Sequence, residues 1–477
     1  MRLSRTLTGK SDTGRVADGR PRGDHSMTTL RPSRRLLLGT CAGAALLAPL
    51  GVWAWPEQQE SAAGPRAVPT ELRDRDPKAT PEARQVYAML ANLENTARRG
   101  RPSRTVIGQH VELHNERYNP QYGDYQGTKA PGYYYRKARD ITGRLPGFVE
   151  LDLGPGYGQP GWAVGQARSY SGAWPSCRRY WGYTEDAVDL AVGVWAGLPR
   201  TADGSYRPSG THRECASGAE VSLPHNGGAP AGLVGFSFHQ PYPGSPVKGY
   251  TQTLHRNSPA AKDPRWFARM TSPGTAEHKS LQLDLAFLAD HLGYLAGRGV
   301  PVLLRPYHEM NTAPGRGFWW AGQDPDAFRT LWRLTYDYLV NRRGLHNLIF
   351  VWAPNSWDGS YGREPRAYYP GGRYVDIVGV DDYSDTPARP FGGGAWTEVW
   401  YRGLERYRRP RIVSESFHVP LNAAQPRTLT RTPWVLWTVW GQALSYDNVS
   451  APRKKNTADD VKRTYHSSRM ITAQDFG

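Results

Sequence analysis

A (β/α)8 barrel, an α/β fold in which eight parallel strands alternate with helices, is the architecture that the sequence predicts. Short apolar runs recur along the chain, and helical or loop stretches separate most of them. Eight such runs between residues 80 and 477 suit this barrel when insertions are allowed. Nearly every run ends in polar residues, as expected where a barrel carries its site at the carboxyl ends of its strands. The predicted strands are 105–107, 148–153, 233–238, 302–305, 348–352, 375–380, 411–413 and 434–439.

Helix signals lie around these strands. Residues 80–82 (Thr, Pro, Glu) combine an N-cap, a proline at the first helical position and an acidic first turn. Leucines recur at helical spacing between residues 281 and 295, and Asp324 begins another helix. The longest insertion, residues 154–230, is rich in Gly, Pro, Ser and Trp. We expect it to form a long loop after the second strand that shapes the site, rather than a separate domain.

The N-terminus carries a targeting signal. Arg34 and Arg35 precede an apolar segment that ends near Ala54, which predicts a twin-arginine-type signal peptide with an N-terminal extension over residues 1–54. Met27 would be a more conventional start. An uncleaved membrane anchor is the alternative. Residues 55–79 are predicted to be a linker and residues 80–477 a single catalytic domain. We therefore expect a secreted or cell-surface protein that is not stably inserted in a membrane once the signal is cleaved.

The composition limits the classes of partner. The formal net charge of +17 is scattered along the chain without a nucleic-acid motif, so no nucleic-acid partner is expected. The 17 Trp and 27 Tyr residues exceed what is usual, and such rings can stack on sugars as well as fill a core. After signal cleavage only Cys177 and Cys215 remain, and in an oxidising compartment they are predicted to form a disulfide. Two free buried thiols are the alternative, and the protein is expected to be a monomer.

The fourth predicted strand is followed directly by candidate functional residues. Its apolar residues are followed by Arg305, His308 and Glu309, and a second glutamate, Glu415, follows the seventh strand. Two carboxylates that face each other across a barrel mouth suit the cleavage of a glycosidic bond, because one can protonate the leaving oxygen while the other attacks the anomeric carbon. Identical side chains can take both roles only if their surroundings separate their pKa values.

Several motifs resemble glycoside hydrolase family 26, a family of β-mannanases and a few other endo-β-glycanases. The resemblance covers residues 80–477 and is strongest from residue 300 onward. The segments that carry it are Arg-Pro-Tyr-His-Glu-Met-Asn at 305–311, Phe-Trp-Trp at 318–320, 369–371, 374–383, Ser-Glu at 414–415 and 459–465. The resemblance implies a retaining endo-β-glycanase, with β-1,4-mannan as the first choice of substrate. A β-1,3-xylanase or mixed-linkage β-glucanase is the alternative within the family, and a non-hydrolytic polysaccharide-binding cell-surface protein is the alternative of another class.

The same resemblance assigns roles to individual residues. It implies that Glu309 is the acid/base and Glu415 the nucleophile. His308 would contact the sugar and hold the nucleophile, while Tyr383 would hydrogen-bond Glu415. The other residues that it places at the substrate are His239, Arg305, Phe318, Trp319, Trp320, Asp381 and either Trp440 or Trp437, of which one forms the floor of the central subsite.

The sequence departs from the family pattern near these residues. Residues 312–316 form an insertion, Gly317 stands where an aromatic platform is expected, and residues 416–418 (Ser, Phe, His) replace a glycine-containing turn. These departures leave both carboxylates in place and concern the neighbouring subsites. Several histidines end predicted strands, but no ligand spacing supports a metal, so we expect neither a metal nor another cofactor. The expected partner is a polysaccharide substrate.

Overall fold

The computed structural model divides the chain into two units, Met1–Pro49 and Leu50–Gly477. The described residues all lie in the second unit: 67–72, 75–111, 133–153, 183–196, 210–213, 220–223, 232–246, 250–356, 362–383, 398–423, 428–445 and 456–476. The predicted signal peptide, the first part of the linker, and both Cys177 and Cys215 lie outside them. No helix within those ranges is long and apolar enough to cross a membrane.

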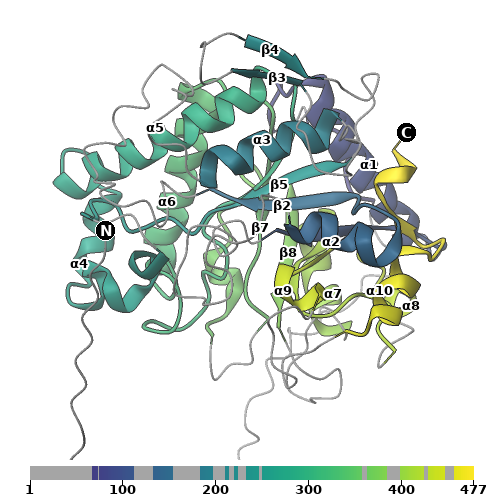
Figure 1. Cartoon of the computed structure of the whole chain (residues 1–477). Helices are drawn as coiled ribbons and strands as arrows, with labels where there is room; N and C mark the ends of the chain where they lie inside the picture. The colour runs from purple at the N-terminus through teal and green to yellow at the C-terminus, as the bar shows by residue number, and fades with distance from the viewer. Residues whose placement is uncertain are drawn as a thin grey trace, which may run out of the picture. The chain divides into compact units, whose positions relative to one another are not determined.

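Eight parallel strands close into a barrel, which confirms the predicted fold class (Figure 1). Each strand pairs with the next in chain order, and the first strand also pairs with the last, so that Val106 lies opposite Leu436. The barrel strands are β1 (Thr105–His110), β2 (Phe148–Asp152), β5 (Leu233–Ser237), β6 (Val302–Arg305), β7 (Leu348–Trp352), β8 (Ile377–Asp382), β9 (Arg411–Ser416) and β10 (Leu436–Val439). A further short strand, β11 (Met470–Ile471), adds to β1.

The strand boundaries differ from prediction where they matter for the site. β8 begins two residues later than expected and continues through Asp381, and β9 continues through Glu415. Between these strands the register shifts, because Val380 pairs with Val413 and the next residue, Asp381, pairs with Glu415. The skipped residue, Ser414, makes this a β-bulge, which locally changes the direction of side chains.

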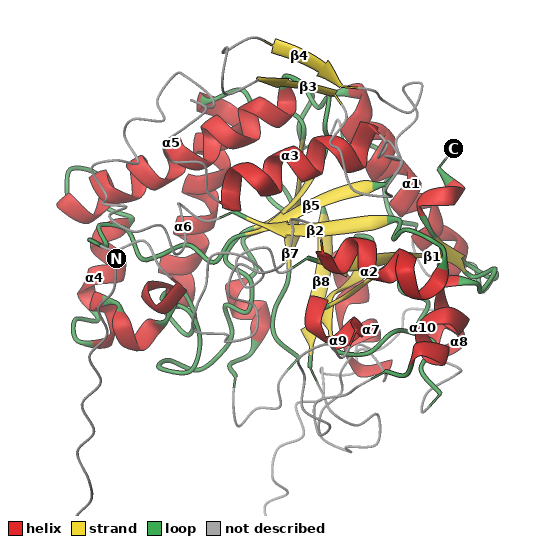
Figure 2. Ribbon diagram, in the orientation of Figure 1, coloured by secondary structure: helices red, strands yellow, loops and turns green. Residues whose placement is uncertain are grey.

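Helices surround the barrel (Figure 2). The α-helices after the first are α2 (Tyr133–Thr142), α3 (Tyr183–Ala196), α4 (Arg265–Met270), α5 (Ala276–Ala296), α6 (Pro325–Tyr336), α7 (Glu398–Gly403), α8 (Thr428–Arg431), α9 (Gly441–Ser445) and α10 (Ala458–Tyr465). A π-helical turn, η7 (Asp337–Arg342), continues α6. The 3-10 turns are η4 (Tyr250–Thr253), η5 (His255–Asn257), η6 (Pro259–Ala261), η8 (Pro365–Tyr368), η9 (Leu404–Tyr407) and η11 (Ala473–Asp475).

The insertion after the second strand contains more regular structure than expected. It includes α3 and a hairpin of β3 (Gly210–Arg213) and β4 (Glu220–Leu223). In α3 the stretch from Ala187 to Trp195 is mostly apolar, and its buried residues belong to the core cluster between barrel and helices. The expectation of one long loop is therefore corrected, because this apolar run buries itself against the barrel despite the Gly- and Pro-rich residues around it.

Helix α1 (Pro81–Arg98) covers the amino end of the barrel. It begins as predicted, with the Thr80 hydroxyl accepting a hydrogen bond from the Ala83 amide over 3.2 Å. Its buried face, which includes Leu90, packs in one cluster with alternate strand residues such as Leu303 and Ile349. The residues between them, such as Leu304, pack with the outer helices instead. Since α1 covers this end, the carboxyl ends of the strands are left to carry the site.

Candidate active site

The acidic residue after β6 sits in an unusual backbone conformation. Tyr307 and Glu309 have φ angles of 49° and 55°, in the left-handed region that side chains other than glycine rarely adopt. Packing holds this turn in place. The Tyr307 hydroxyl lies 2.8 Å from Thr335 Oγ1, and the Glu309 amide donates to the Ala353 carbonyl over 2.9 Å. Such conformations persist only where the surrounding structure determines them, and they are common at functional sites.

Arg305 is the centre of the site. Each of its three guanidinium nitrogens donates to a carboxylate on a different strand: Nε to Glu150 over 2.6 Å, Nη1 to Asp381 over 2.9 Å, and Nη2 to Glu415. The side chain is 1% exposed. Burial alone would lower its pKa, but the three carboxylates outweigh burial and raise the pKa well above the usual value, so Arg305 remains charged.

Glu415 is held through both of its carboxylate oxygens. Arg305 donates to Oε1, and the Tyr383 hydroxyl donates to Oε2. His308 Nε2 lies 3.9 Å from Oε1. Burial and the charge of Glu415 raise the pKa of Tyr383 well above its usual value, so the phenol keeps the proton that it donates. Because an ionised carboxylate only accepts hydrogen bonds, donors on both oxygens suit the charged form of Glu415.

Glu309 has the opposite environment. Burial, followed by the negative charge of Glu415, raises the pKa of Glu309 to about 8. Among the described residues, its direct side-chain donor is Asn355 Nδ2, 2.9 Å from Oε1. Asn355 is itself fixed, since its amide donates to Asn311 Oδ1 over 2.7 Å and its carbonyl accepts from Asn311 Nδ2 over 2.9 Å. The site therefore pairs a carboxyl group that keeps its proton at neutral pH with a carboxylate surrounded by donors.

Two histidines pack beside the pair. His239 follows β5; its amide donates to Asp152 Oδ1 over 2.9 Å, and its ring Nδ1 contacts the other carboxylate oxygen. Burial lowers the pKa of His239, but the carboxylate outweighs burial and the pKa is raised. Burial and the nearby Arg305 charge lower the pKa of His308 well below its usual value, so this ring is neutral. The two rings meet edge to face at 4.9 Å.

Most of the predicted aromatic contacts lie in the core. Trp319, Trp320 and Trp437 are all 0% exposed, and each indole N–H donates to a backbone carbonyl. These three are therefore core residues rather than sugar contacts, which corrects the expectation. Phe318 is 7% exposed and stacks on Trp320 at 4.7 Å, with its edge near both histidines. It is the member of this aromatic run that reaches the site.

Of the two candidates for the subsite floor, Trp437 is buried and Trp440 is partly exposed, and the role of Trp440 in a subsite stays a prediction. Trp440 follows the last residue of β10 and stacks on His110 with ring centroids 4.2 Å apart and an interplanar angle of 20°. Its edge faces Tyr383 at 6.2 Å. The other predicted polar contact, Asp381, is fully buried and accepts from Ser414 over 2.6 Å as well as from Arg305. Asp381 therefore positions Arg305 instead of meeting a sugar.

The departures from the family pattern have a packing explanation. A Cβ atom added to Gly317 would lie 2.8 Å from Ala321 Cβ, so glycine is required by the close approach of the chain there. Thr312, at the start of the insertion, is 1% exposed and bridges to Gly362, whereas residues 314–316 are exposed. The insertion therefore protrudes from the barrel between two anchored ends.

Sequence reasoning missed three contributors. Glu150 and Asp152 alternate with apolar residues on the second predicted strand, but the sequence does not show that their partners are Arg305 and His239. Asn355 follows the fifth predicted strand, and nothing in the sequence marks it as the donor to Glu309. Alternation on a strand of a parallel barrel was the available signal, because inward-facing charges at a strand's carboxyl end must find partners.

Among the described residues, His308, Asp381 and Glu415 bring possible ligand atoms within 4.8 Å of one another. Arg305 donates to both of these carboxylates, so a metal ion would compete with a guanidinium charge. The expectation that no metal takes part stays a prediction.

The fold and the site define a (β/α)8-barrel protein with a carboxyl–carboxylate pair at the ends of its fourth and seventh strands. The model of glycosyl hydrolase family 26 matches residues 200–400, which include Glu309. Together with the relatives described next, this match shows that the chain is similar to glycosyl hydrolase family 26 and to β-mannanases.

Two relatives show the extent of the similarity. The chain is 28% identical over 320 residues to mannan endo-1,4-beta-mannosidase A and B of Caldalkalibacillus mannanilyticus, covering 65% of this chain and 47% of the relative. It is 31% identical over 182 residues to a mannan endo-1,4-beta-mannosidase of Bacillus subtilis, covering 36% of this chain and 45% of the relative. The chain thus spans about half the length of the curated relatives it matches.

Solved structures show the same fold. GH26A from Muricauda sp. superposes with a TM-score of 0.56 at 22% identity, covering 84% of this chain and 98% of that chain. A β-mannanase from a symbiotic protist of the termite Reticulitermes speratus, complexed with gluco-manno-oligosaccharide, gives a TM-score of 0.56 at 20% identity. The match covers 84% of this chain and 96% of that chain. At these identities the likeness supports the barrel and does not extend to the substrate.

Proposed function

We propose that this protein is an exported, retaining endo-β-1,4-mannanase. The observation that carries the proposal is the contrast between the two glutamates. Glu309 keeps a proton at neutral pH because of burial and the Glu415 charge, whereas Glu415 receives donors on both oxygens. Mannan is the first choice of substrate because the curated relatives are named as mannan endo-1,4-beta-mannosidases.

In the first step Glu415 attacks the anomeric carbon. The bond between that carbon and the glycosidic oxygen breaks, and the Glu309 proton passes to the departing oxygen. The leaving chain departs with a free hydroxyl, and the remaining sugar is bound to Glu415 as an ester. Esterification removes the Glu415 charge that raises the pKa of Glu309, so the deprotonated Glu309 becomes suited to act as a base.

In the second step water attacks the same carbon. Glu309 takes a proton from the water, the water oxygen forms the new bond, and the Glu415 carboxylate leaves. Arg305 and Tyr383 donate to the oxygens on which the returning charge appears. Two displacements at one carbon retain its configuration, and Glu309 ends protonated as it began.

Replacement of Glu415 tests the reaction. Glu415→Ala is expected to abolish hydrolysis, and azide is expected to restore turnover with a glycosyl azide of inverted configuration as product. Glu398→Ala is the matched control, because this carboxylate lies on the exposed pair with Arg402 and should leave activity unchanged. Full hydrolysis by a folded Glu415→Ala protein would refute the assignment.

A substrate panel tests the specificity. Mannan, glucomannan, β-1,3- and β-1,4-xylan and mixed-linkage β-glucan, with product analysis, are expected to show internal cleavage of mannan and glucomannan. Cleavage of xylan or β-glucan alone would keep the reaction and replace the substrate. Tight binding of a glycan without turnover anywhere in the panel would favour a polysaccharide-binding protein instead.

Export and the disulfide are parts of the same proposal that rest on sequence. Replacing Arg34 and Arg35 by lysine is expected to reduce the protein found outside the producing cells, and N-terminal sequencing of the exported form would locate cleavage. Alkylation with and without reduction, followed by mass spectrometry, would show whether Cys177 and Cys215 are bonded. Accumulation outside the cell that is unaffected by the arginine substitutions would contradict the twin-arginine assignment.

A further inference from the structure

We propose that Glu150 is a positioning residue for the carboxylate pair: it shares the Arg305 guanidinium with Glu415 and so controls how much of that positive charge reaches the site. The inference rests on the proposed function, because it concerns the same two glutamates. Glu150 has no recorded interaction with Glu309 among the described residues, and it acts through its hydrogen bond with Arg305.

Three carboxyl groups share the guanidinium of Arg305. Glu150 Oε1 accepts from Nε over 2.6 Å, and the two terminal nitrogens serve Asp381 and Glu415. One positive charge therefore faces three carboxyl groups, and all four side chains are at most 4% exposed. Any negative charge on Glu150 is balanced by the same guanidinium that holds Glu415.

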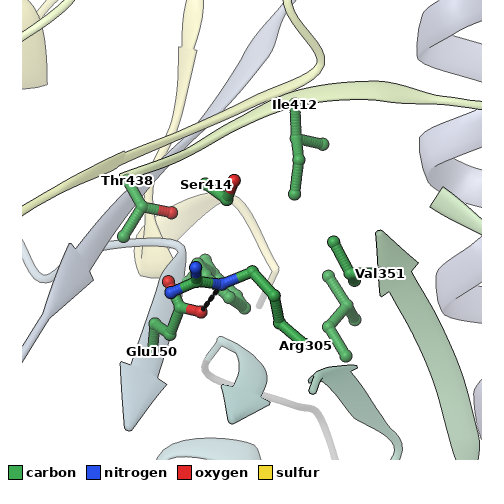
Figure 3. Close-up of a pocket in the computed structure, with 8 residues that line it drawn as sticks. Glu150, Arg305, Val351, Ile412, Ser414 and Thr438 are labelled. Carbon is green, nitrogen blue, oxygen red and sulfur yellow. Dashed lines mark hydrogen bonds and ion pairs between the residues drawn. The ribbon is translucent and has the colours of Figure 1, made fainter. Parts of the chain in front are cut away.

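Glu150 also borders a cavity inside the barrel (Figure 3). Figure 3 shows the Arg305 guanidinium directed at Glu150, with Ser414 of β9 and Thr438 of β10 nearby. Glu150 Oε2 and Thr438 Oγ1 are both buried and have no hydrogen-bond partner among the described residues. The remaining walls are the apolar side chains of Phe148, Leu303, Val351 and Ile412. An ionised oxygen in such surroundings is costly, so a proton on Oε2 is favoured.

The charges around Glu150 place its proton exchange in the neutral range. Burial and then the Glu415 charge raise its pKa to about 7, against the lowering effect of Arg305. Burial also raises the pKa of Asp381 well above its usual value. Among the described residues, the titratable and charged groups around Glu150 include His110 on β1, Asp152 on β2, Arg305 on β6, Asp381 on β8 and Glu415 on β9.

The consequence reaches Glu309 through electrostatics. When Glu150 is ionised, it neutralises part of the Arg305 charge, and that charge is one of the influences that lower the pKa of Glu309. Glu309 then keeps its proton to higher pH. An ionised Glu150 is thus expected to extend, toward alkaline pH, the range in which Glu309 can act as an acid.

Glu150→Gln tests this role, because glutamine keeps the volume and an acceptor oxygen for Arg305 but carries no charge. The basic limb of the kcat/KM profile on mannan is expected to move to lower pH by about one unit, the scale of one charge acting over roughly 10 Å at an effective dielectric constant of about 20. A purely structural role would reduce the amount of folded enzyme without moving this limb. If the basic limb of the Glu150→Gln profile lies within about 0.2 pH units of the wild-type limb, the proposal is overturned.

Glu94→Gln is the matched control. Glu94 is also fully buried and paired with an arginine, through a 2.8 Å hydrogen bond from Arg411 Nε, but it lies on α1 at the amino end of the barrel. This substitution should reduce stability and leave the limb in place. If Glu150→Gln does not fold, Thr438→Val provides a second test. It removes a hydroxyl from the lining of the cavity that Glu150 borders, favours neutral Glu150 and should move the limb in the same direction by a smaller amount; no movement would overturn the proposal.

A melting measurement separates this inference from the proposed function. Because burial raises the pKa of Glu150 in the folded state, ionised Glu150 should destabilise the fold increasingly as pH rises from about 4.5 through about 7. The Tm of Glu150→Gln relative to wild type is therefore expected to increase between pH 5 and pH 8. A relative Tm that is constant with pH would overturn the inference even if wild type proves inactive on every glycan. Absence of hydrolysis by wild type alone would refute only the proposed function.

Discussion

Removing the charge of Glu415 should change the proton affinity of Glu309. The perturbation is Glu415→Gln, which keeps the shape of the side chain. Glu309 has a pKa of about 8, with the Glu415 charge as the second-largest cause after burial. For carboxyl groups about 5.5 Å apart, as expected for a retaining pair, one charge contributes about 3 kcal/mol at an effective dielectric constant of about 20. That energy corresponds to about 2 pKa units, so the pKa of Glu309 should fall to about 6.

The assay is ¹³C NMR of protein labelled at the glutamate side-chain carboxyl carbon, titrated from pH 4 to pH 10. The Glu309 resonance is the one that disappears in Glu309→Gln. The freed Arg305 nitrogen acts in the same direction as the lost charge, so the two effects cannot cancel. A Glu309 pKa that stays near 8 in Glu415→Gln would refute the reasoning, because burial alone would then set the proton affinity.

Three further predictions concern the reaction and its support. Tyr383→Phe removes the donor to Glu415 Oε2, so kcat should fall about 10- to 100-fold, as for the loss of a charged hydrogen bond; unchanged steady-state kinetics would contradict this. Gly317→Ala should lower the unfolding free energy by about 1–3 kcal/mol in urea titrations because of the 2.8 Å approach to Ala321 Cβ. Gly297→Ala, with its nearest neighbour at 3.6 Å, is the control and should not destabilise. Incubation with EDTA should leave hydrolysis unchanged, and loss of activity that zinc restores would implicate a metal.

Much of the fold could be predicted because the barrel strands are buried on both faces. A strand such as β7 is a continuous apolar run, which is typical of a parallel sheet covered by helices on its outer face. Eight such runs along one chain suit a closed barrel. The positions of Glu309 and Glu415 followed from the same logic, since they come where an apolar run ends. What the sequence could not show is the bulge at Ser414, because register depends on pairing with β8 rather than on local residue type.

The aromatic residues show a second limit of sequence reasoning. Trp319 and Trp320 lie close in sequence to the candidate catalytic residue Glu309. A tryptophan side chain can serve either as a platform for a sugar or as part of the core, and the sequence does not distinguish the two. Which of the two a tryptophan becomes depends on the helices that pack against it. Phe318, their neighbour, is the one of the three that contacts both His239 and His308 in the described part of the chain. The partners of Glu150 were equally hidden, since Arg305 is 155 residues away.

The closure of the barrel has a consequence for how the protein can be made. β1 pairs with β10, which the ribosome supplies some 330 residues later. A nascent chain that stops before Leu436 leaves β1 and β9 as open parallel edges, and unpaired edges of this kind promote association with other chains. The three carboxyl groups around Arg305 already lie on β2, β8 and β9, so a truncated chain could assemble the charges of the site without a closed ring to exclude water from them. Folding to an active state should therefore be all-or-none with respect to β10.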